Sequence, residues 1–196
     1  MLNKFVQKIN NMSLAKTSKE DIIKKAYKVF RIKGYHNTSI ADLAEACQIH
    51  NAHFYYYFKN KEDLMGEVLI FVKDYLIKNF SHLIDNDLLT PKQKLSKMKS
   101  FFEQTYHHDN GGCIMANTTL ELAFFEPSFL PIIKDFFEKL FDLLSKLLIT
   151  QYQENKAREL AEAIIQDIEG GIMLMKLYKN NKYLLNALNR AEKLLD

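Results

Sequence analysis

Apolar residues return along most of this chain every three or four positions, which is the spacing of one face of an α-helix. Residues 38–61 carry this pattern twice, on either side of a short break at Gln48-Ile49. Phe54 and Phe58, four positions apart, mark the second helix of the pair. The first helix has four residues on its apolar face: Ile40, Leu43, Ala44 and Cys47. The pattern therefore predicts two short helices joined by a tight turn.

The start of this helix pair and its outer face carry polar groups. Thr38 or Ser39 can cap the first helix, because a hydroxyl oxygen accepts from an exposed backbone N–H. Asp42 follows Ser39 by three residues, where an acid completes a capping box. The second helix has four polar or aromatic residues outside its apolar stripe: Asn51, His53, Tyr55 and Tyr56. A helix with such an outer face suits the major groove of DNA.

The remaining pattern predicts helices along almost the whole chain. Hydrophobic residues make up 47% of the sequence, and only 3 prolines and 6 glycines interrupt it, so long helices are expected and a sheet protein is not. Gly34 ends the first predicted helix, and Pro91 and Pro127 each open one. The expected helices outside the pair cover these approximate ranges: 18–33, 61–83, 91–107, 114–125, 127–153, 156–178 and 182–195.

Composition narrows the class of protein. No apolar run approaches the roughly 20 residues that a membrane span needs. The first 17 residues are too polar for a secretory signal. We therefore expect a cytoplasmic protein with no membrane partner. Only Cys47 and Cys113 are present, so we expect no disulfide framework.

Charge differs between the two parts of the chain. Residues 1–65 contain eleven Lys and Arg against six Asp and Glu, and the remainder contains sixteen against eighteen. A basic N-terminal part fits contact with DNA phosphates at one end of the molecule. Ordinary surface charge would give similar numbers, so the charge favours a nucleic-acid partner only together with the helix pair.

Residues from about Lys19 to Leu69 resemble the DNA-binding domain of the TetR family of bacterial transcriptional repressors. The family's recognition helix follows the pattern Gly-Val-Ser-x-Gly-x-Leu-Tyr-x-x-Phe-x-x-Lys-x-x-Leu, and residues 48–64 here read QIHNAHFYYYFKNKEDL. Four positions match: Tyr55, Phe58, Lys61 and Leu64. Three depart from the pattern in chemical character, namely Gln48, His50 and Ala52, whereas Ile49 and Phe54 keep the apolar character of their positions. These departures make the family's base preference less transferable.

The resemblance implies an all-α fold of about nine helices. It implies an N-terminal extension at 1–17, a three-helix helix-turn-helix domain at 18–65, and a larger ligand-binding and dimerisation domain at 66–196, entered through a linking helix. The implied function is a ligand-responsive regulator, a repressor that binds a palindromic double-stranded DNA operator as a homodimer and is released by a small-molecule inducer. The alternative is a helix-turn-helix protein without small-molecule sensing.

The resemblance also assigns roles on the DNA side and at the subunit interface. Thr38, Ser39 and Lys61 are expected at phosphates, while Asn51, His53, Tyr55 and Tyr56 are expected to face the groove. Two heptad-like rows in the last two helices are expected to form the dimer interface: Leu160, Ile164, Ile168, Gly171, Met175 and Tyr178 in the first, and Leu184, Leu188, Ala191 and Leu195 in the second. Gly170 and Gly171 in mid-helix favour a close approach of another helix, which we expect to be the partner subunit's.

A ligand pocket is expected in the larger domain. The segment from Gly112 to Glu121 resembles a Gly-Cys-x-x-x-Asn-x-x-x-Glu pattern found in one branch of the family, some of whose members respond to electrophiles. The expected pocket draws on Phe102, Tyr106, Cys113, Asn117, Glu121, Phe137 and Met173. Cys113 is either a thiolate that senses electrophiles or oxidants, or a small buried residue packed beside the pocket.

No enzyme motif competes with this interpretation. The sequence has no glycine-rich phosphate loop, no Gly-x-Ser-x-Gly elbow and no His-Glu-x-x-His pair. We therefore expect no enzymatic activity and no cofactor. His107, His108 and Asp109 could ligate a metal, but no further ligand stands at a defined spacing, so a solvated loop is the simpler interpretation.

Overall fold

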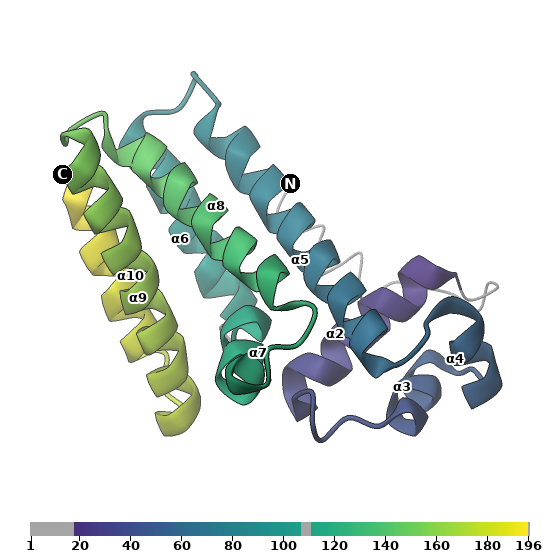
Figure 1. The fold of residues 1–196 in the computed structure, drawn as a ribbon. Coiled ribbons are helices and arrows are strands. Elements are labelled where there is room, and N and C mark those ends of the chain that lie inside the picture. The colour runs from purple at the N-terminus through teal and green to yellow at the C-terminus, as the bar shows by residue number, and fades with distance from the viewer. Residues whose placement is uncertain (1–17, 107–110, 196) are drawn as a thin grey trace. The chain divides into compact units, whose positions relative to one another are not determined.

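The computed structural model describes residues 18–106 and 111–195. Within these residues the chain forms nine α-helices and two short 3-10 helices, without a strand (Figure 1). The expected all-α fold is confirmed for this part of the chain. The expected N-terminal extension and the loop at 107–110, with its possible metal ligands, lie outside the described residues.

The chain divides into two compact units. Among the described residues, the first comprises 18–74 and 113–134, and the second comprises 75–106, 111–112 and 135–195. Helices α5 (Lys61–Ile84) and α8 (Leu130–Leu148) each contribute to both units. A boundary at residue 65 stays a prediction.

The first unit begins with helix α2 (Lys19–Lys33), whose two ends are set by local sequence. The hydroxyl of Ser18 accepts from the N–H of Asp21, and the carboxylate of Asp21 accepts from the N–H of Ser18. Gly34 ends the helix with φ at 80°, a left-handed angle that costs glycine little. Its N–H still donates to the Phe30 carbonyl.

Helices α3 (Ile40–Cys47), α4 (Asn51–Tyr57) and α7 (Ile114–Leu122) complete the first unit, with the 3-10 helix Ala123–Phe125 after α7. The predicted helix from Pro127 begins later, at Leu130. Glu126 has a left-handed backbone with φ at 45°, and the carboxylate of Glu62 accepts from both the N–H and the hydroxyl of Ser128. These features keep the residues before Leu130 in a turn. The unit packs around fully buried apolar side chains: Ile22, Ala26, Leu43, Phe54, Leu64, Val68, Leu69 and Met115.

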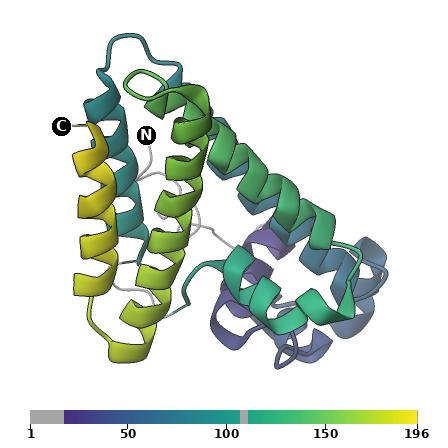
Figure 2. The same cartoon turned by 60° about the vertical axis from the view of Figure 1, so that its left-hand side comes forward.

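In the second unit, α9 (Glu154–Tyr178) and α10 (Lys182–Glu192) run side by side as a hairpin (Figures 1 and 2). Lys179 makes the turn in a left-handed conformation with φ at 51°. Helix α6 (Pro91–Tyr106) packs against α10. The 3-10 helix Lys193–Leu195 directly follows α10 in the chain. The ion pair of Lys99 with Glu192, at 2.8 Å, joins α6 to the end of α10.

Gly171 explains why α9 and α10 approach so closely. A Cβ atom at this position would lie 3.0 Å from the Tyr183 carbonyl oxygen and 3.1 Å from the Leu184 Cα. A Cβ at Gly170 would meet nothing within 4 Å. The close approach that we expected at the subunit interface is therefore made at Gly171 inside one chain, and only Gly170 leaves open space.

No helix in the described part of the chain combines the length and the apolar character needed to cross a membrane.

Candidate nucleic-acid interface

The first helix of the predicted pair, α3, is capped by Ser39 rather than Thr38. The Ser39 hydroxyl accepts from the N–H of Asp42 at 3.1 Å, and the Asp42 carboxylate accepts from the N–H of Ser39 at 2.8 Å. Lys33 donates to the same carboxylate at 2.8 Å. These contacts, first that of Lys33 and then those of Ser39, lower the pKa of Asp42 far below its usual range. Ser39 remains exposed, as a phosphate contact requires.

The turn between α3 and α4 forms with the residue that departs from the family pattern. Gln48 adopts the left-handed conformation with φ at 58° and ψ at 44°, at a cost of about 1 kcal/mol relative to glycine. Its N–H donates to the Glu45 carbonyl at 2.9 Å, and the N–H of Ile49 donates to the Ala44 carbonyl at 3.0 Å. The turn therefore closes without glycine.

Helix α4 divides into a buried face and an exposed face. Phe54 is fully buried, and Phe58 packs against it with ring centroids 5.5 Å apart. His53 stacks on Tyr56 with centroids 6.1 Å apart, so the exposed aromatic rings support one another. We name the exposed set the α4 face: Asn51, His53, Tyr55 and Tyr56. This division matches the pattern expected from the sequence.

Two residues that we expected at phosphates, Thr38 and Lys61, instead form hydrogen bonds within the chain. Thr38 is only 1% exposed, and its hydroxyl donates to the Gly34 carbonyl at 2.6 Å. The Lys61 ammonium donates to the carbonyls of Tyr35 and Thr38, both at 2.8 Å, and lies 4.3 Å from the centre of the Tyr35 ring. Burial lowers the pKa of Lys61, and the charge of Glu121 opposes that shift. Contrary to expectation, both residues hold the turn before α3 in this conformation.

Glu121 also has a different position from the one expected. Its carboxylate accepts from the N–H of Tyr35 at 2.8 Å and from the N–H of His36 at 2.5 Å. We expected this residue to contact a ligand, but here it contacts the same turn as Lys61. Residues 35 and 121 are too far apart in sequence for periodicity to pair them.

The other expected ligand residues are only partly brought together. In the second unit, Phe102 stacks on Tyr106 with centroids 6.3 Å apart, and Phe137 contacts Phe136 at 5.2 Å. Met173 is 55% exposed, so it does not line an enclosed pocket within this unit. In the first unit, Cys113 is buried at the N-cap of α7, and Asn117 follows one turn later.

The only other thiol has no sensing geometry. Burial raises the pKa of Cys47 to about 11, and this outweighs the charge of Lys25, which lowers it. Cys47 therefore stays protonated at neutral pH.

Across residues 18–106 and 111–195, no three His, Cys, Asp or Glu side chains gather as a metal site would require.

The expected dimer residues are mostly buried inside the second unit. Ile164, Ile168 and Leu188 surround a small apolar space with residues of α6 and α8. A different row on α9 is turned outward, and we name it the α9 face: Ala163, Gln166, Gly170, Met173 and Leu177. It repeats every three or four residues, which the pattern of one packing face requires.

Comparison with known proteins gives a consistent result over both parts of the chain. Residues 22–68 match the family described as "Bacterial regulatory proteins, tetR family", and residues 92–190 match "Transcriptional regulator LmrA/YxaF-like, C-terminal domain". The chain is 23% identical over 170 residues to the HTH-type transcriptional repressor DhaR of Mycobacterium sp. (strain GP1), covering 84% of this chain and 85% of that protein. It is 28% identical over 179 residues to the uncharacterized HTH-type transcriptional regulator YxaF of Bacillus subtilis (strain 168), covering 86% and 90%.

Solved structures agree with these matches. A TetR transcriptional regulator from Legionella pneumophila has a TM-score of 0.86 and 27% identity, covering 94% of this chain and 100% of that one. The regulatory protein TetR from Rhodobacter sphaeroides has a TM-score of 0.82 at 18% identity, covering 92% and 100%, which is a likeness of fold alone.

Proposed function

Because the chain belongs to the TetR family of bacterial DNA-binding transcriptional regulators, we propose that it is a repressor that binds a palindromic operator as a homodimer and leaves it when a small molecule binds the helical body. The family consists of regulators, not enzymes. A relative that the chain matches over most of its length is named a transcriptional repressor, which supports this direction of control.

The observation that carries the proposal is the α4 face. It combines an amide, an imidazole and two phenols on the outside of a helix whose other side is fixed by Phe54 and Phe58. An asparagine amide can bond adenine through two hydrogen bonds, and His53 and the tyrosines add contacts to neighbouring bases or phosphates. Ser39, at the exposed start of α3, is a further candidate for a phosphate.

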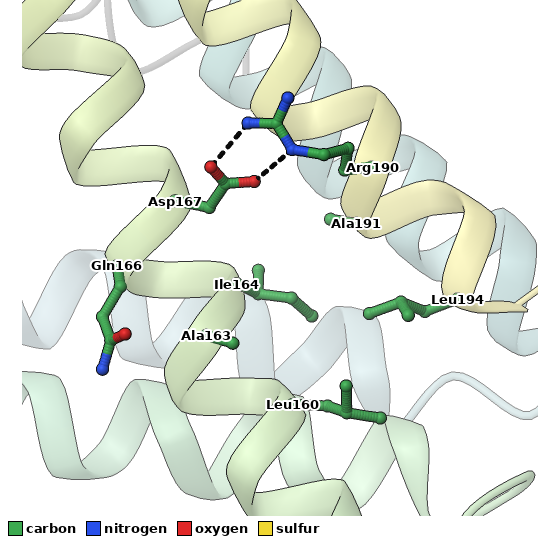
Figure 3. Close-up of a pocket in the computed structure, with 8 residues that line it drawn as sticks. All are labelled: Leu160, Ala163, Ile164, Gln166, Asp167, Arg190, Ala191 and Leu194. Carbon is green, nitrogen blue, oxygen red and sulfur yellow. Dashed lines mark hydrogen bonds and ion pairs between the residues drawn. The ribbon is translucent and has the colours of Figure 1, made fainter.

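Dimerisation through α9 and α10 is supported by their exposed surface. A groove of about 520 Å³ lies along these two helices (Figure 3). Leu160, Ile164 and Leu194 point into the space between them, and Gln166 points away from α10. Asp167 accepts from two nitrogens of Arg190, at 2.7 Å and 2.5 Å, which fixes the wall of the groove.

The α9 face continues from this groove along the same helix, since Ala163 and Gln166 also line the groove. Met173 and Leu177 expose large apolar side chains, and Gly170 leaves room for a neighbouring backbone. In a four-helix bundle formed by two subunits, such a row would become part of the core. The α9 face thus replaces the buried residues of our first choice, Ile168, Gly171 and Met175, while Leu160 and Ile164 line the groove.

Binding of an inducer is supported by an apolar region in the second unit. Phe80, Phe101, Phe102 and Tyr106 form a cluster of rings. Beside Phe102, residues of α6, α8, α9 and α10 enclose a space of about 10 Å³, which has room for one water molecule at most. A ligand would therefore have to move these side chains apart, and that movement would couple binding to a change of conformation.

The deciding experiment is selection of duplex DNA from a random pool by the full-length protein, followed by gel shifts with and without candidate ligands. A symmetric selected site, released by at least one small organic compound, is the expected result. A selected site whose affinity no compound changes would favour the alternative, a DNA-binding protein without small-molecule sensing. Failure to select any duplex would contradict DNA binding itself.

A thiol sensor is a second candidate, and it rests on Cys113. This residue is the N-cap of α7, where the partial positive charge of the helix end favours a thiolate. The comparison is wild type against Cys113→Ser, each treated with N-ethylmaleimide before the gel shift. Release of DNA by wild type alone would support the thiol sensor, and equal release of both proteins would reject it.

A further inference from the structure

Two opposite charges hold the turn that precedes α3. The carboxylate of Glu121 accepts from the backbone N–H groups of Tyr35 and His36. The ammonium of Lys61 donates to the backbone carbonyls of Tyr35 and Thr38. One charge thus satisfies the donors of the turn and the other satisfies its acceptors. We name the contact of Glu121 with the two N–H groups the Glu121 latch.

The latch fits closely against the backbone. Gly34 has φ at +80°, and a Cβ atom there would lie 3.0 Å from Glu121 Oε2 and 3.3 Å from Oε1. The turn therefore needs glycine both for its angle and for the approach of the carboxylate. The Tyr35 ring is fixed as well, with its centroid 5.8 Å from that of Phe129 and 6.0 Å from that of Phe30.

The latch connects α7 to the start of the DNA-reading helices. Ser39, the N-cap of α3, follows Tyr35 by four residues, so a shift of the turn would shift the beginning of α3. On the other side, Cys113, Asn117 and Glu121 are spaced four apart, which puts them along one side of α7. A displacement near Cys113 would therefore reach Glu121 through two turns of helix.

We propose that Glu121 is a positioning residue for DNA recognition: through its carboxylate, α7 sets the placement of α3 and α4, so DNA affinity depends on where α7 lies. The inference rests on the proposed function, since it requires that the α4 face reads DNA.

Three variants separate this role from general stability. Glu121→Ala removes the latch, and Glu121→Gln keeps the shape but only one acceptor oxygen. Glu126→Gln is the matched control, because Glu126 is exposed and lies five residues further along. Each full-length variant is tested on the duplex that wild type selects from a random pool, with thermal melting and amide hydrogen exchange measured on the free protein.

For Glu121→Ala we expect the dissociation constant for the duplex to rise about tenfold, since hydrogen bonds to a charged group are lost. Glu121→Gln should give a smaller rise, and Glu126→Gln none. Amide exchange at Tyr35 and His36 should become at least about tenfold faster in Glu121→Ala, because these N–H groups lose their acceptor. Exchange within α4 should not change.

The outcomes are distinguishable. If wild type selects no duplex, both the proposed function and this inference fail. If wild type selects a duplex and Glu121→Ala binds it equally well, only the inference fails. A loss of affinity that merely follows a lower melting temperature, with faster exchange throughout α2, α3 and α4, would also overturn it, since that is the result of a stability effect alone.

Discussion

Asn51 and His53 open α4 with two side chains that can form hydrogen bonds to base edges. We expect Asn51→Ala to change the base preferred at one position in each half-site and to cost about 1 to 3 kcal/mol of discrimination there. His53→Ala should change a neighbouring position. The measurement is duplex selection with each variant, and Asn155→Ala, an exposed amide on α9, is the control. Uniform weakening on all sequences by either α4 variant would contradict base recognition by that residue.

The stability that Asp42 provides at the start of α3 depends on pH. Its pKa is lowered in the folded chain by Lys33 and Ser39, whereas in the unfolded chain it should lie near about 3.9. As pH falls below about 4 the unfolded chain takes up the proton first, so the stability from these contacts is present above that pH and lost below it. We expect Asp42→Asn to lower the melting temperature at pH 7 by a few degrees and to lose less further stability between about pH 4.5 and 2.5 than wild type. Parallel curves for the two proteins would contradict this assignment.

The roles of single residues could be predicted only where their partners are close in sequence. Ser39 and Asp42 are three residues apart, and their capping box is confirmed. Thr38 and Lys61 have the right chemistry for phosphates, yet their polar atoms are used by the turn before α3. Glu121 meets that turn across more than eighty residues of chain, and no local pattern contains this pairing.

Helix α9 provides a matched pair of glycines, Gly170 and Gly171. Gly171→Ala should destabilise the protein by about 1 to 3 kcal/mol, because the new methyl group would press on the backbone of Tyr183 and Leu184. Gly170→Ala adds the same methyl group where nothing lies within 4 Å, so it should leave stability unchanged or raise it by up to about 1 kcal/mol. Urea unfolding measures the difference, with both variants made in the Leu177→Asp background, where we expect monomers. Equal destabilisation by the two variants would contradict this packing.

Helix positions followed from the sequence more readily than helix faces did. Helix α4 was expected from Asn51 to Tyr57 and has those bounds. The pattern in α9 was also correct in period, but most of the row chosen for a partner subunit, from Ile164 to Met175, is buried within the chain. Both rows repeat every three or four residues, and a sequence does not say which neighbour each row meets. Gly170 and Gly171 are adjacent in sequence and differ completely in surroundings, for the same reason.

The assembled molecule is expected to be a two-fold symmetric dimer. In such a dimer the two α4 helices would reach successive major grooves, which predicts half-sites about 34 to 36 Å apart or a multiple of that distance. Footprints with two-fold symmetry would support the arrangement. A single asymmetric site for a monomeric protein would contradict it.

Leu177 tests whether the α9 face holds the two subunits together. This side chain is 68% exposed in the single chain, so Leu177→Asp should leave the fold of each subunit intact, while a buried carboxylate at an interface would cost several kcal/mol. We expect sedimentation at micromolar concentration to show dimers for wild type and monomers for Leu177→Asp, with binding to a full palindrome reduced to the level of a single half-site. Leu88→Asp is the control, since Leu88 is 92% exposed in the connection between α5 and α6. If both variants remain dimeric, the α9 face is not the interface; if the Leu88 variant alone dissociates, the subunits meet at that connection instead.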